Sequence, residues 1–343
     1  MSMKAIYLEK PGSVSVKEIP EPEPQAGEVL VRIKSMAICG SDVAAYRGVN
    51  PLVSYPRIIG HELAGVVEST DKAGATELAP GQRVVLEPYL SCGECYPCSI
   101  GRRNSCIDLK VLGVQTDGGM SEYFSFPKEL VHPIPDTFTV EQAASVEPLT
   151  IALHSVHRGA VKAGEHVVVF GAGPIGNLIS QVSKAYGAKA IVVDILPERL
   201  QLASDLGAAY TINAQETDVV ERVREITDGR LAECVFEATG ALPIIRQTID
   251  VVSNAGRIVF TGHPKSDVEL PTGLFIKKEL DVRGSRTSAG EFPEAIQLID
   301  SGKVNVQSIV SETVDFSELP AYLAQMAENP QKYVKVVGVI GEK

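Results

Sequence analysis

The stretch "VVVFGAGPIGNLI", residues 167–179, joins a run of apolar, β-branched residues to a glycine-rich turn and then to an apolar helical pattern. Similar apolar runs follow it, as expected for buried parallel strands, at 190–194, 234–238 and 257–260. Helices are predicted over 174–187, which has a proline in its first turn and a glycine at its end, and over 197–206. Alternating strands and helices predict an α/β fold built on a doubly wound parallel sheet.

The glycines of this stretch form the pattern G-x-G-x-x-G between a strand and a helix. Such a turn lets a pyrophosphate approach the backbone at the helix N-terminus. Asp194 ends the next strand, where a carboxylate can accept hydrogen bonds from ribose hydroxyls and would repel the extra phosphate of NADP. We therefore expect NAD as cofactor; the alternative is that the glycines serve helix packing alone and Asp194 caps its strand. The residues assigned to the site are Gly171, Gly173, Pro174, Ile175, Gly176, Asp194 and Arg199.

Length and charge narrow the class of protein further. A chain of 343 residues favours two domains. No apolar run approaches the roughly 18 residues of a membrane span, and the N-terminal residues have no signal or transit character, so we expect a soluble, cytoplasmic protein. A formal net charge of -11 argues against binding nucleic acid, whose affinity for proteins depends on Lys and Arg.

Four of the six cysteines lie within "SCGECYPCSIGRRNSC", residues 91–106, at the spacing C-x2-C-x2-C-x7-C. Four soft ligands at short spacing suit tetrahedral zinc, and a four-thiolate site leaves no position for a substrate. An iron–sulfur cluster is the main alternative, but its run usually closes with x3 and a following proline; redox or incidental cysteines are a third interpretation. We therefore predict a zinc ion that stabilises a loop and catalyses nothing, with the ligands Cys92, Cys95, Cys98 and Cys106.

The first 149 residues contain short β-rich runs broken by proline and glycine, which indicate a compact antiparallel β domain with long loops. After about residue 284, "EFPEAIQLIDSGKV" is helix-like and "YVKVVGVI" strand-like, and this tail is expected to return to the first domain. The predicted domains are thus 1–149 with 284–343, including the cysteine lobe at 91–106, and 150–283. Cys234, in a predicted buried strand, is assigned no function.

A second, open metal site is suggested by three scattered segments: "AICGSD" with Cys39, "IIGHELAG" with His61 and Glu62, and "SVEPLTIALH" with Glu147. Each segment also has a simpler structural interpretation. Cys39 could be a small core residue, His61 and Glu62 could be surface polar residues, and Glu147 could be a charge in the first turn of a helix. Beside a nicotinamide site, however, a thiolate, an imidazole and one or two carboxylates would form a zinc site with a position left for water or substrate.

These motifs, in this order and over essentially the whole length, resemble the zinc-dependent medium-chain dehydrogenases: "CGSD", "GHE", the four cysteines, "DGGMSEY", "EPL" and "GAGPIG". Because "EPL" places Glu147 where simple alcohol dehydrogenases have a cysteine, the chain resembles the polyol (sorbitol) branch. "YRGVNPLVSYPRIIGHE" and "CYPCSIG" are similar to bacterial sugar-acid members, the L-galactonate and L-gulonate 5-dehydrogenases. The resemblance implies a GroES-like β domain beside a Rossmann domain, with the active site between them.

The resemblance also implies roles for individual residues. Cys39, His61 and either Glu62 or Glu147 would surround a catalytic zinc, and the two carboxylates would exchange roles during turnover. Asp42 would orient a ligand such as His61, and Ser41 would take the proton of the substrate hydroxyl. The family often has histidine two residues after this aspartate; here Ala44 stands there, so the proton relay is expected to be shorter. Tyr46, Arg47 and Arg286 are assigned to the substrate.

The implied reaction is the NAD-dependent oxidation of a secondary alcohol of a sugar acid or polyol to a ketone. A sorbitol or alditol dehydrogenase, an L-threonine 3-dehydrogenase, which usually has the histidine missing at Ala44, and a non-catalytic dinucleotide-binding protein are the alternatives. Relatives are homo-dimers or homo-tetramers, and "RIVF" at 257–260 is expected near the edge of the parallel sheet, as a subunit contact.

Overall fold

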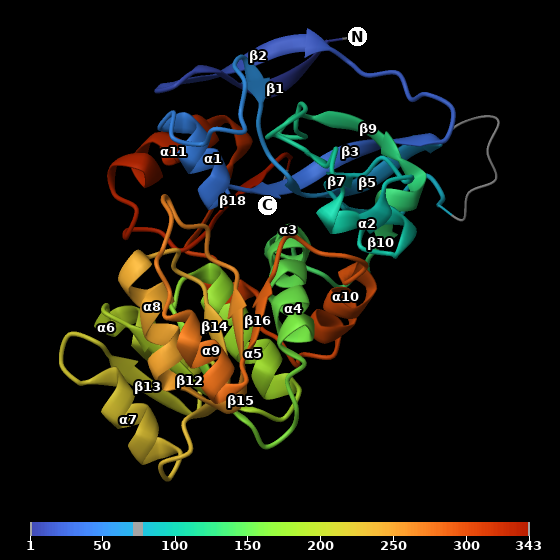
Figure 1. Cartoon of the computed structure of the whole chain (residues 1–343). Coiled ribbons are helices and arrows are strands. Elements are labelled where there is room, and N and C mark those ends of the chain that lie inside the picture. The colour runs from blue at the N-terminus through green and yellow to red at the C-terminus, as the bar shows by residue number, and fades with distance from the viewer. Residues whose placement is uncertain (1, 71–77, 342–343) are drawn as a thin grey trace. The chain divides into compact units, whose positions relative to one another are not determined.

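The computed structural model of the protein describes residues 2–70 and 78–341, and the chain divides into two compact units (Figure 1). The first unit comprises Met1–Glu147, Phe292–Asp300 and Ile309–Lys343, and the second comprises Pro148–Glu291 and Ser301–Ser308. No helix in the described ranges is long and apolar enough to cross a membrane.

The second unit contains one six-stranded sheet in which all the paired strands are parallel. Its order, β13-β12-β11-β14-β15-β16, is that of doubly wound dinucleotide-binding folds. The apolar runs predicted as strands are strands. Their bounds are β11 (His166–Phe170), β12 (Lys189–Asp194), β13 (Tyr210–Asn213), β14 (Ala232–Glu237), β15 (Val252–Phe260) and β16 (Asp281–Gly284).

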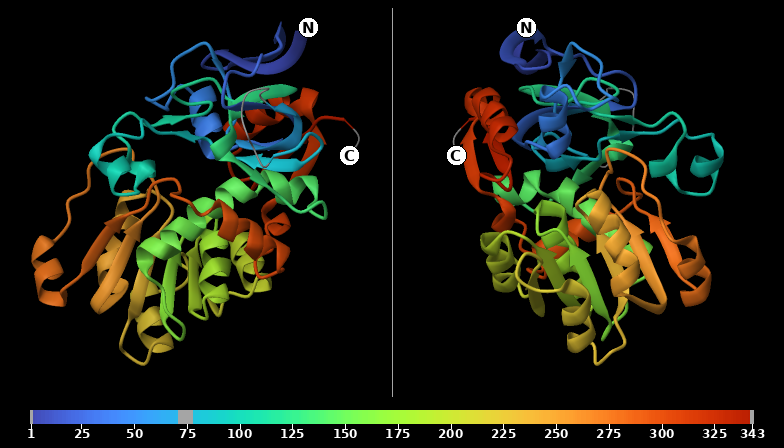
Figure 2. Two further views of the ribbon diagram at one scale, coloured as in Figure 1. Left: turned by 90° about the vertical axis from the view of Figure 1, so that its right-hand side faces the viewer. Right: turned by 60° about the vertical axis from the view of Figure 1, so that its left-hand side comes forward.

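Helices connect these strands and pack against them, as Figures 1 and 2 show: α5 against β11 and β12, and α8 against β14 and β15. Both predicted helices are present, as α5 and α6. The bounds are α4 (Val146–Gly159), α5 (Pro174–Ala185), α6 (Pro197–Asp205), α7 (Val219–Ile226), α8 (Leu242–Val251) and α9 (Thr272–Lys278). Because helices cover the strands, residues of β11 such as Val168 and Val169 are fully buried although they point to opposite faces.

Strand β15, which contains "RIVF", lies near the edge of the sheet, as expected, with only β16 beyond it. The bounds of the unit differ from the sequence-based expectation. The second unit continues to Glu291 and includes Ser301–Ser308, whereas we expected it to end at 283. Side-chain contacts account for both additions: Glu291 accepts hydrogen bonds from two histidines of α4, and Asn305 bonds to Gln181 of α5.

The first unit is built from sheets whose strand pairs are antiparallel, as predicted, except that β17 and β18 run parallel. A seven-stranded sheet has the order β10-β6-β5-β3-β18-β17, with β9 also paired to β3; a three-stranded sheet has the order β2-β1-β4; and β7 pairs with β8. The C-terminal strand β18 thus joins the sheet of the N-terminal strands. The bounds are β1 (Ser2–Lys10), β2 (Ser13–Pro20), β3 (Glu28–Ala37), β4 (Arg57–Ile58), β5 (Glu62–Thr70), β6 (Arg83–Leu86), β7 (Tyr89–Leu90), β8 (Lys110–Val111), β9 (Tyr123–Pro127), β10 (Val131–Pro133), β17 (Glu312–Asp315) and β18 (Val336–Val339).

The core of this unit consists of aliphatic residues from the strands, among them Val31, Ile33 and Leu86, and it extends to Leu319 and Leu323 of helix α11. The predicted C-terminal helix and strand are α10 and β18. The helices of the unit are α1 (Gly40–Tyr46), α2 (Tyr96–Ser99), α3 (Val140–Ala144), α10 (Phe292–Asp300) and α11 (Leu319–Glu328).

Candidate metal centres and dinucleotide site

The pairing of two strands brings the first group of metal donors together. Strands β3 and β5 are antiparallel, and Ala37 at the end of β3 lies opposite Glu62 at the start of β5. Cys39 follows β3 at the N-terminus of α1, and His61 immediately precedes β5. The donor atoms of Cys39, His61 and Glu62 all lie within 4.8 Å of one another. A thiolate, an imidazole and a carboxylate are the ligand types of open zinc sites.

The electrostatics of this cluster favour a bound cation. Burial alone would lower the pKa of His61, but the Cys39 thiolate and the Asp42 carboxylate beside it raise that pKa well above its usual range. Burial also raises the pKa of Asp42, which is almost completely enclosed. Several groups that are negative when ionised therefore share one buried region, and a divalent metal ion would compensate their charge. On both donor chemistry and charge, the residues fit a zinc ion.

Asp42 and Ser41 lie next to the donors, on the first turn of α1. The Oδ2 atom of Asp42 accepts the backbone N–H of Cys39 at 2.9 Å, so this carboxylate fixes the cysteine loop. Its Oδ1 atom is 4.0 Å from Nδ1 of His61, too far for a hydrogen bond, and neither atom has a partner within the described part of the chain. The Oγ atom of Ser41 is 3.4 Å from Nε2 of His61.

Glu62 has a partner that the sequence reasoning missed. The Nζ atom of Lys335, directly before β18, donates to Oε1 of Glu62 at 2.5 Å and to Oε2 at 2.6 Å. Lys335 is 3% exposed and Glu62 is 1% exposed, so this is a fully buried ion pair. The available signal was the lysine inside the apolar run "YVKVVGVI", where a charged residue needs a buried partner.

Glu147, at the start of α4, has a different buried partner, Tyr89 of β7, whose hydroxyl donates to Oε1 of Glu147. Burial raises the pKa of Glu147 to about 7, against the influence of His61, which lowers it. Burial, followed by the charge of Glu147, raises the pKa of Tyr89 well above its usual range. Glu147 and His61 affect each other's pKa, so Glu147 is near the donor cluster, but it is not one of the three residues whose donor atoms lie within 4.8 Å.

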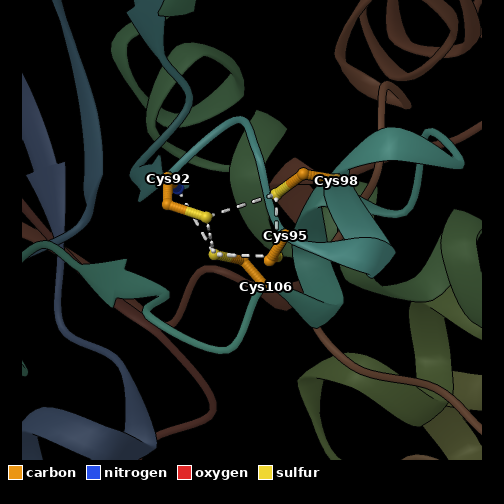
Figure 3. A group of neighbouring side chains, drawn as sticks. All are labelled: Cys92, Cys95, Cys98 and Cys106. Carbon is orange, nitrogen blue, oxygen red and sulfur yellow. Dashed lines mark hydrogen bonds between the residues drawn. The ribbon is translucent and has the colours of Figure 1, made fainter.

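The four cysteines of the lobe form a second metal-binding arrangement (Figure 3). None is in a disulfide bond, and the sulfur–sulfur distances are 3.4 Å for Cys95–Cys98, 3.5 Å for Cys92–Cys106, 3.8 Å for Cys95–Cys106 and 4.0 Å for Cys92–Cys98. Tetrahedral zinc with bonds of about 2.3 Å requires its sulfurs to be about 3.8 Å apart. Backbone N–H groups of Cys92 and Asp108 point at Cys106 Sγ, as is suitable for a thiolate. The lobe therefore fits a closed zinc site.

In the second unit, the three glycines have the properties that a dinucleotide requires. Gly171 has φ +94°, in the left-handed region, and a Cβ on Gly176 would lie 1.7 Å from the carbonyl oxygen of Gly171. A Cβ on Gly173, in contrast, would meet no described atom within 4 Å. Gly173 is also the N-cap residue of α5 and has no side chain with which to cap the N–H groups of the first turn. The turn therefore leaves room and hydrogen-bond donors for a pyrophosphate.

Asp194 lies at the end of β12, as predicted, and its carboxylate already contacts the glycine-rich turn. Oδ2 accepts the N–H of Ala172 at 2.7 Å, and Oδ1 accepts the N–H groups of Ile195 at 2.7 Å and Leu196 at 3.0 Å. These bonds correspond to the strand-end capping role that we considered as an alternative, and they also fix the carboxylate beside the turn. Arg199, half-buried, lies two residues into helix α6.

The three residues assigned to the substrate lie in different units. Tyr46 is half-buried at the end of α1 and packs against the core of the first unit, while Arg47 beside it is exposed. Arg286 follows β16 in the second unit and is also exposed. Tyr46 therefore has a packing role, and Arg47 and Arg286 lie on the surfaces of their units.

Comparisons with known proteins give the family of the chain and several similar proteins. Residues 25–136 match the family described as alcohol dehydrogenase GroES-like domain, and residues 174–301 match zinc-binding dehydrogenase. The chain is 47% identical to an uncharacterized zinc-type alcohol dehydrogenase-like protein of Haemophilus influenzae, over 98% of each chain. It is 33% identical to L-galactonate-5-dehydrogenase of Escherichia coli, also over 98% of each. Among solved structures, RspB of Escherichia coli complexed with NADH is 37% identical, with a TM-score of 0.93 and 99% of both chains covered.

Proposed function

The chain belongs to the zinc-type alcohol dehydrogenase family, and we propose that it oxidises a secondary alcohol of a sugar acid or polyol to the ketone with NAD. The observation that carries this proposal is the cluster of Cys39, His61 and Glu62, in which the cysteine is half-buried and the other two side chains are buried. Two relatives, 47% and 33% identical to the chain, both have names that describe dehydrogenases. The four-cysteine lobe and the glycine-rich turn also support the proposal.

Cys39, His61 and Glu62 would hold the catalytic zinc, with Glu147 beside them. When bound, zinc supplies Lewis acidity that favours loss of the proton from a substrate hydroxyl. The protein residues then have two tasks. Cys39 and His61 hold the ion in a buried, low-dielectric region, where its charge is weakly screened. Asp42 fixes the Cys39 backbone and so maintains the position of the thiolate.

Ser41 is our candidate acceptor for the substrate proton, because its Oγ lies 3.4 Å from Nε2 of His61, a member of the donor cluster. Ala44 leaves no histidine on α1 two residues after Asp42, so the proton would pass from Ser41 to solvent by a shorter route. Once the hydroxyl has lost its proton, transfer of hydride from the carbon that carries this oxygen becomes favourable.

The second unit would bind the dinucleotide. NAD supplies the acceptor for the hydride when it is bound. The turn at Gly171–Gly176 would hold its pyrophosphate with backbone N–H groups, and Asp194 would accept hydrogen bonds from the adenosine ribose while disfavouring the phosphate of NADP. The lobe of four cysteines would hold the second zinc and contribute to folding only, because all four positions of its tetrahedron are protein ligands.

A sugar acid is our first choice of substrate. The resemblance of Arg286 to a substrate-contacting arginine of the sorbitol branch supports it, since a guanidinium binds a carboxylate through two hydrogen bonds. The 33% identity to L-galactonate-5-dehydrogenase supports the same class. An alditol, which lacks the carboxylate, is the second choice, because Glu147 stands in the "EPL" motif typical of the sorbitol branch.

The direct test is NAD reduction with a panel of hexonates, hexitols and L-threonine, each with and without a chelator. We expect turnover with one or more hexonates, weaker turnover with hexitols, and loss of both on removal of zinc. Turnover that survives complete removal of metal would refute the metal-dependent mechanism. Turnover confined to L-threonine would refute the sugar-acid assignment while leaving the metal centre in place.

A further inference from the structure

We propose that Lys335 is a positioning residue that restrains the Glu62 carboxylate and thereby keeps the catalytic metal less tightly held and more open than the donor set alone would make it. This inference rests on the proposed function and deepens it, because it states what controls the metal site. Nothing in the family resemblance or the comparisons assigned a role to Lys335.

The geometry shows that Lys335 and a metal ion would share one carboxylate. Both Glu62 oxygens accept hydrogen bonds from the same Nζ atom, at 2.5 and 2.6 Å. A Glu62 oxygen also lies within 4.8 Å of the donor atoms of Cys39 and His61. The ammonium group thus already satisfies part of the hydrogen-bonding capacity and the charge that Glu62 would offer to a cation.

Because both residues are buried, the electrostatic interaction between Lys335 and Glu62 is strong. Lys335 is 3% exposed and Glu62 is 1% exposed, so water does not screen the interaction or replace either partner. Both oxygens of the Glu62 carboxylate face the Nζ atom of Lys335, so the two opposite charges are paired directly. A fixed positive charge beside a metal site repels the ion and reduces the electron density that Glu62 can donate to it.

The position of Lys335 in the chain explains how it is held there. Its backbone carbonyl accepts the N–H of Ser311 at 2.8 Å, and strand β18 begins at the next residue. That strand pairs with β3, which leads to Cys39, so Lys335 and the cysteine loop are fixed by one sheet. The lysine is therefore anchored independently of any metal ion.

A purely structural ion pair predicts the opposite effect of substitution. If Lys335 only stabilised the site, Lys335→Met would leave Glu62 as an unpaired buried charge, loosen the site and speed metal loss. If Lys335 restrains Glu62, the same substitution frees the carboxylate from its competing partner, and Glu62 then binds the metal more strongly. The two interpretations thus differ in the sign of the change in metal affinity.

The experiment measures the rate of metal loss to excess chelator, and the absorption spectrum after cobalt replaces zinc, in the full-length protein. We expect Lys335→Met to slow metal loss from the catalytic site by about tenfold to a hundredfold. The cobalt spectrum of this variant should change in intensity, because the carboxylate of Glu62 binds the ion more strongly, whereas the spectral contribution of the four-cysteine lobe should not change. Faster or unchanged metal loss with an unchanged spectrum would overturn the proposal.

Further variants keep the test interpretable. Lys335→Arg, which retains the charge, should restore the wild-type rate of metal loss, and Lys332→Met, on a surface lysine of the same segment, should have no effect. The double variant with Glu62→Gln and Lys335→Met should lose metal no more slowly than Glu62→Gln alone. If the double variant does lose metal more slowly, the effect of Lys335 does not depend on Glu62. Should Lys335→Met fail to fold, Lys335→Gln removes the charge while retaining a hydrogen-bond donor and should show the same slowing.

The failure of this inference is distinguishable from failure of the proposed function. A wild-type protein that binds metal only at the four cysteines would refute the proposed function. A wild-type protein that binds a second ion at Cys39 and His61, but whose metal loss does not respond to Lys335→Met, would refute the role of Lys335 alone.

Discussion

The two metal-binding arrangements of the first unit use cysteine in opposite ways. In the lobe, four like donors come from one short segment, and their sulfurs lie 3.4 to 4.0 Å apart for the neighbouring pairs. In the other centre, one cysteine joins a histidine and a carboxylate from separate elements, and buried Asp42 and Lys335 surround them. We propose that the lobe would satisfy a metal completely, whereas the mixed centre would leave a coordination position open and control its donors through neighbouring residues.

The sharpest way to break this comparison is to remove the single cysteine of the mixed centre. Cys39→Ala should lower kcat at least about a thousandfold, because the zinc ion loses a ligand and the Lewis acid is lost or misplaced. Zinc content should fall from about two ions per chain to about one. NAD binding, measured by fluorescence titration, should be unchanged, since the dinucleotide site lies in the other unit. Full activity in Cys39→Ala would show that this centre is not the active site.

Removing one cysteine of the lobe should have the complementary effect. Cys98→Ser, at a buried ligand, should cost about 3 kcal/mol of folding free energy and lower the Tm by roughly 6–12 °C. At a temperature where the variant is folded, kcat should stay within about threefold of the wild type, because no substrate position exists on a four-thiolate ion. Calorimetry and steady-state kinetics on the same preparation test both parts. A loss of kcat as large as that of Cys39→Ala would give the lobe a catalytic role.

Asp194 provides a test outside both metal centres. Asp194→Ala should weaken NAD binding by about tenfold to a hundredfold and reduce the preference for NAD over NADP, through loss of the ribose acceptor and of the negative charge. Asp194→Asn is the matched control, because its Oδ1 can still accept the N–H groups of Ile195 and Leu196. If Asn restores NAD affinity but not the preference, the charge sets the preference; if neither variant changes either constant, the carboxylate only caps its strand.

The smallest effect is expected where Tyr89 contacts Glu147. In the metal-free protein, the Tyr89 hydroxyl lowers the pKa of Glu147, which burial holds at about 7. Tyr89→Phe should therefore raise that pKa, and the pH at which zinc rebinding is half-maximal should move upward by about half a unit to one unit. The sign follows because zinc is attracted by the ionised carboxylate, which now forms at a higher pH. A shift to lower pH, or the same shift in Tyr123→Phe, would contradict the assignment.

The two centres also differ in how far the sequence predicts them. The grouping of the four cysteines in the lobe was predictable, because these donors share one short segment, and the structure brings their sulfurs together. The glycine-rich turn was predictable for the same reason, and Gly171, Gly173 and Gly176 have the space and backbone conformation that the pattern requires. In both cases the sequence separation between the functional residues is short, so local geometry decides the site.

The partners in the mixed centre were not predictable from sequence. Lys335 and Glu62 are separated by 273 residues, and only the pairing of β18 with β3 and of β3 with β5 brings them together. Tyr89 lies in a loop-rich stretch before the lobe, where nothing marks it as a partner of Glu147. The end of the second unit was also missed, because contacts of the Glu291 side chain and of the Asn305 backbone, and not a break in pattern, extend it.

The most direct test of the central claim is zinc anomalous diffraction from crystals of the wild-type protein. Two anomalous peaks per chain are expected. One should lie among the sulfurs of Cys92, Cys95, Cys98 and Cys106, and the other should be bonded to Cys39 Sγ and His61 Nε2 with a coordination position open to water or substrate. A single peak in the lobe, with the mixed centre empty at saturating zinc, would contradict the account.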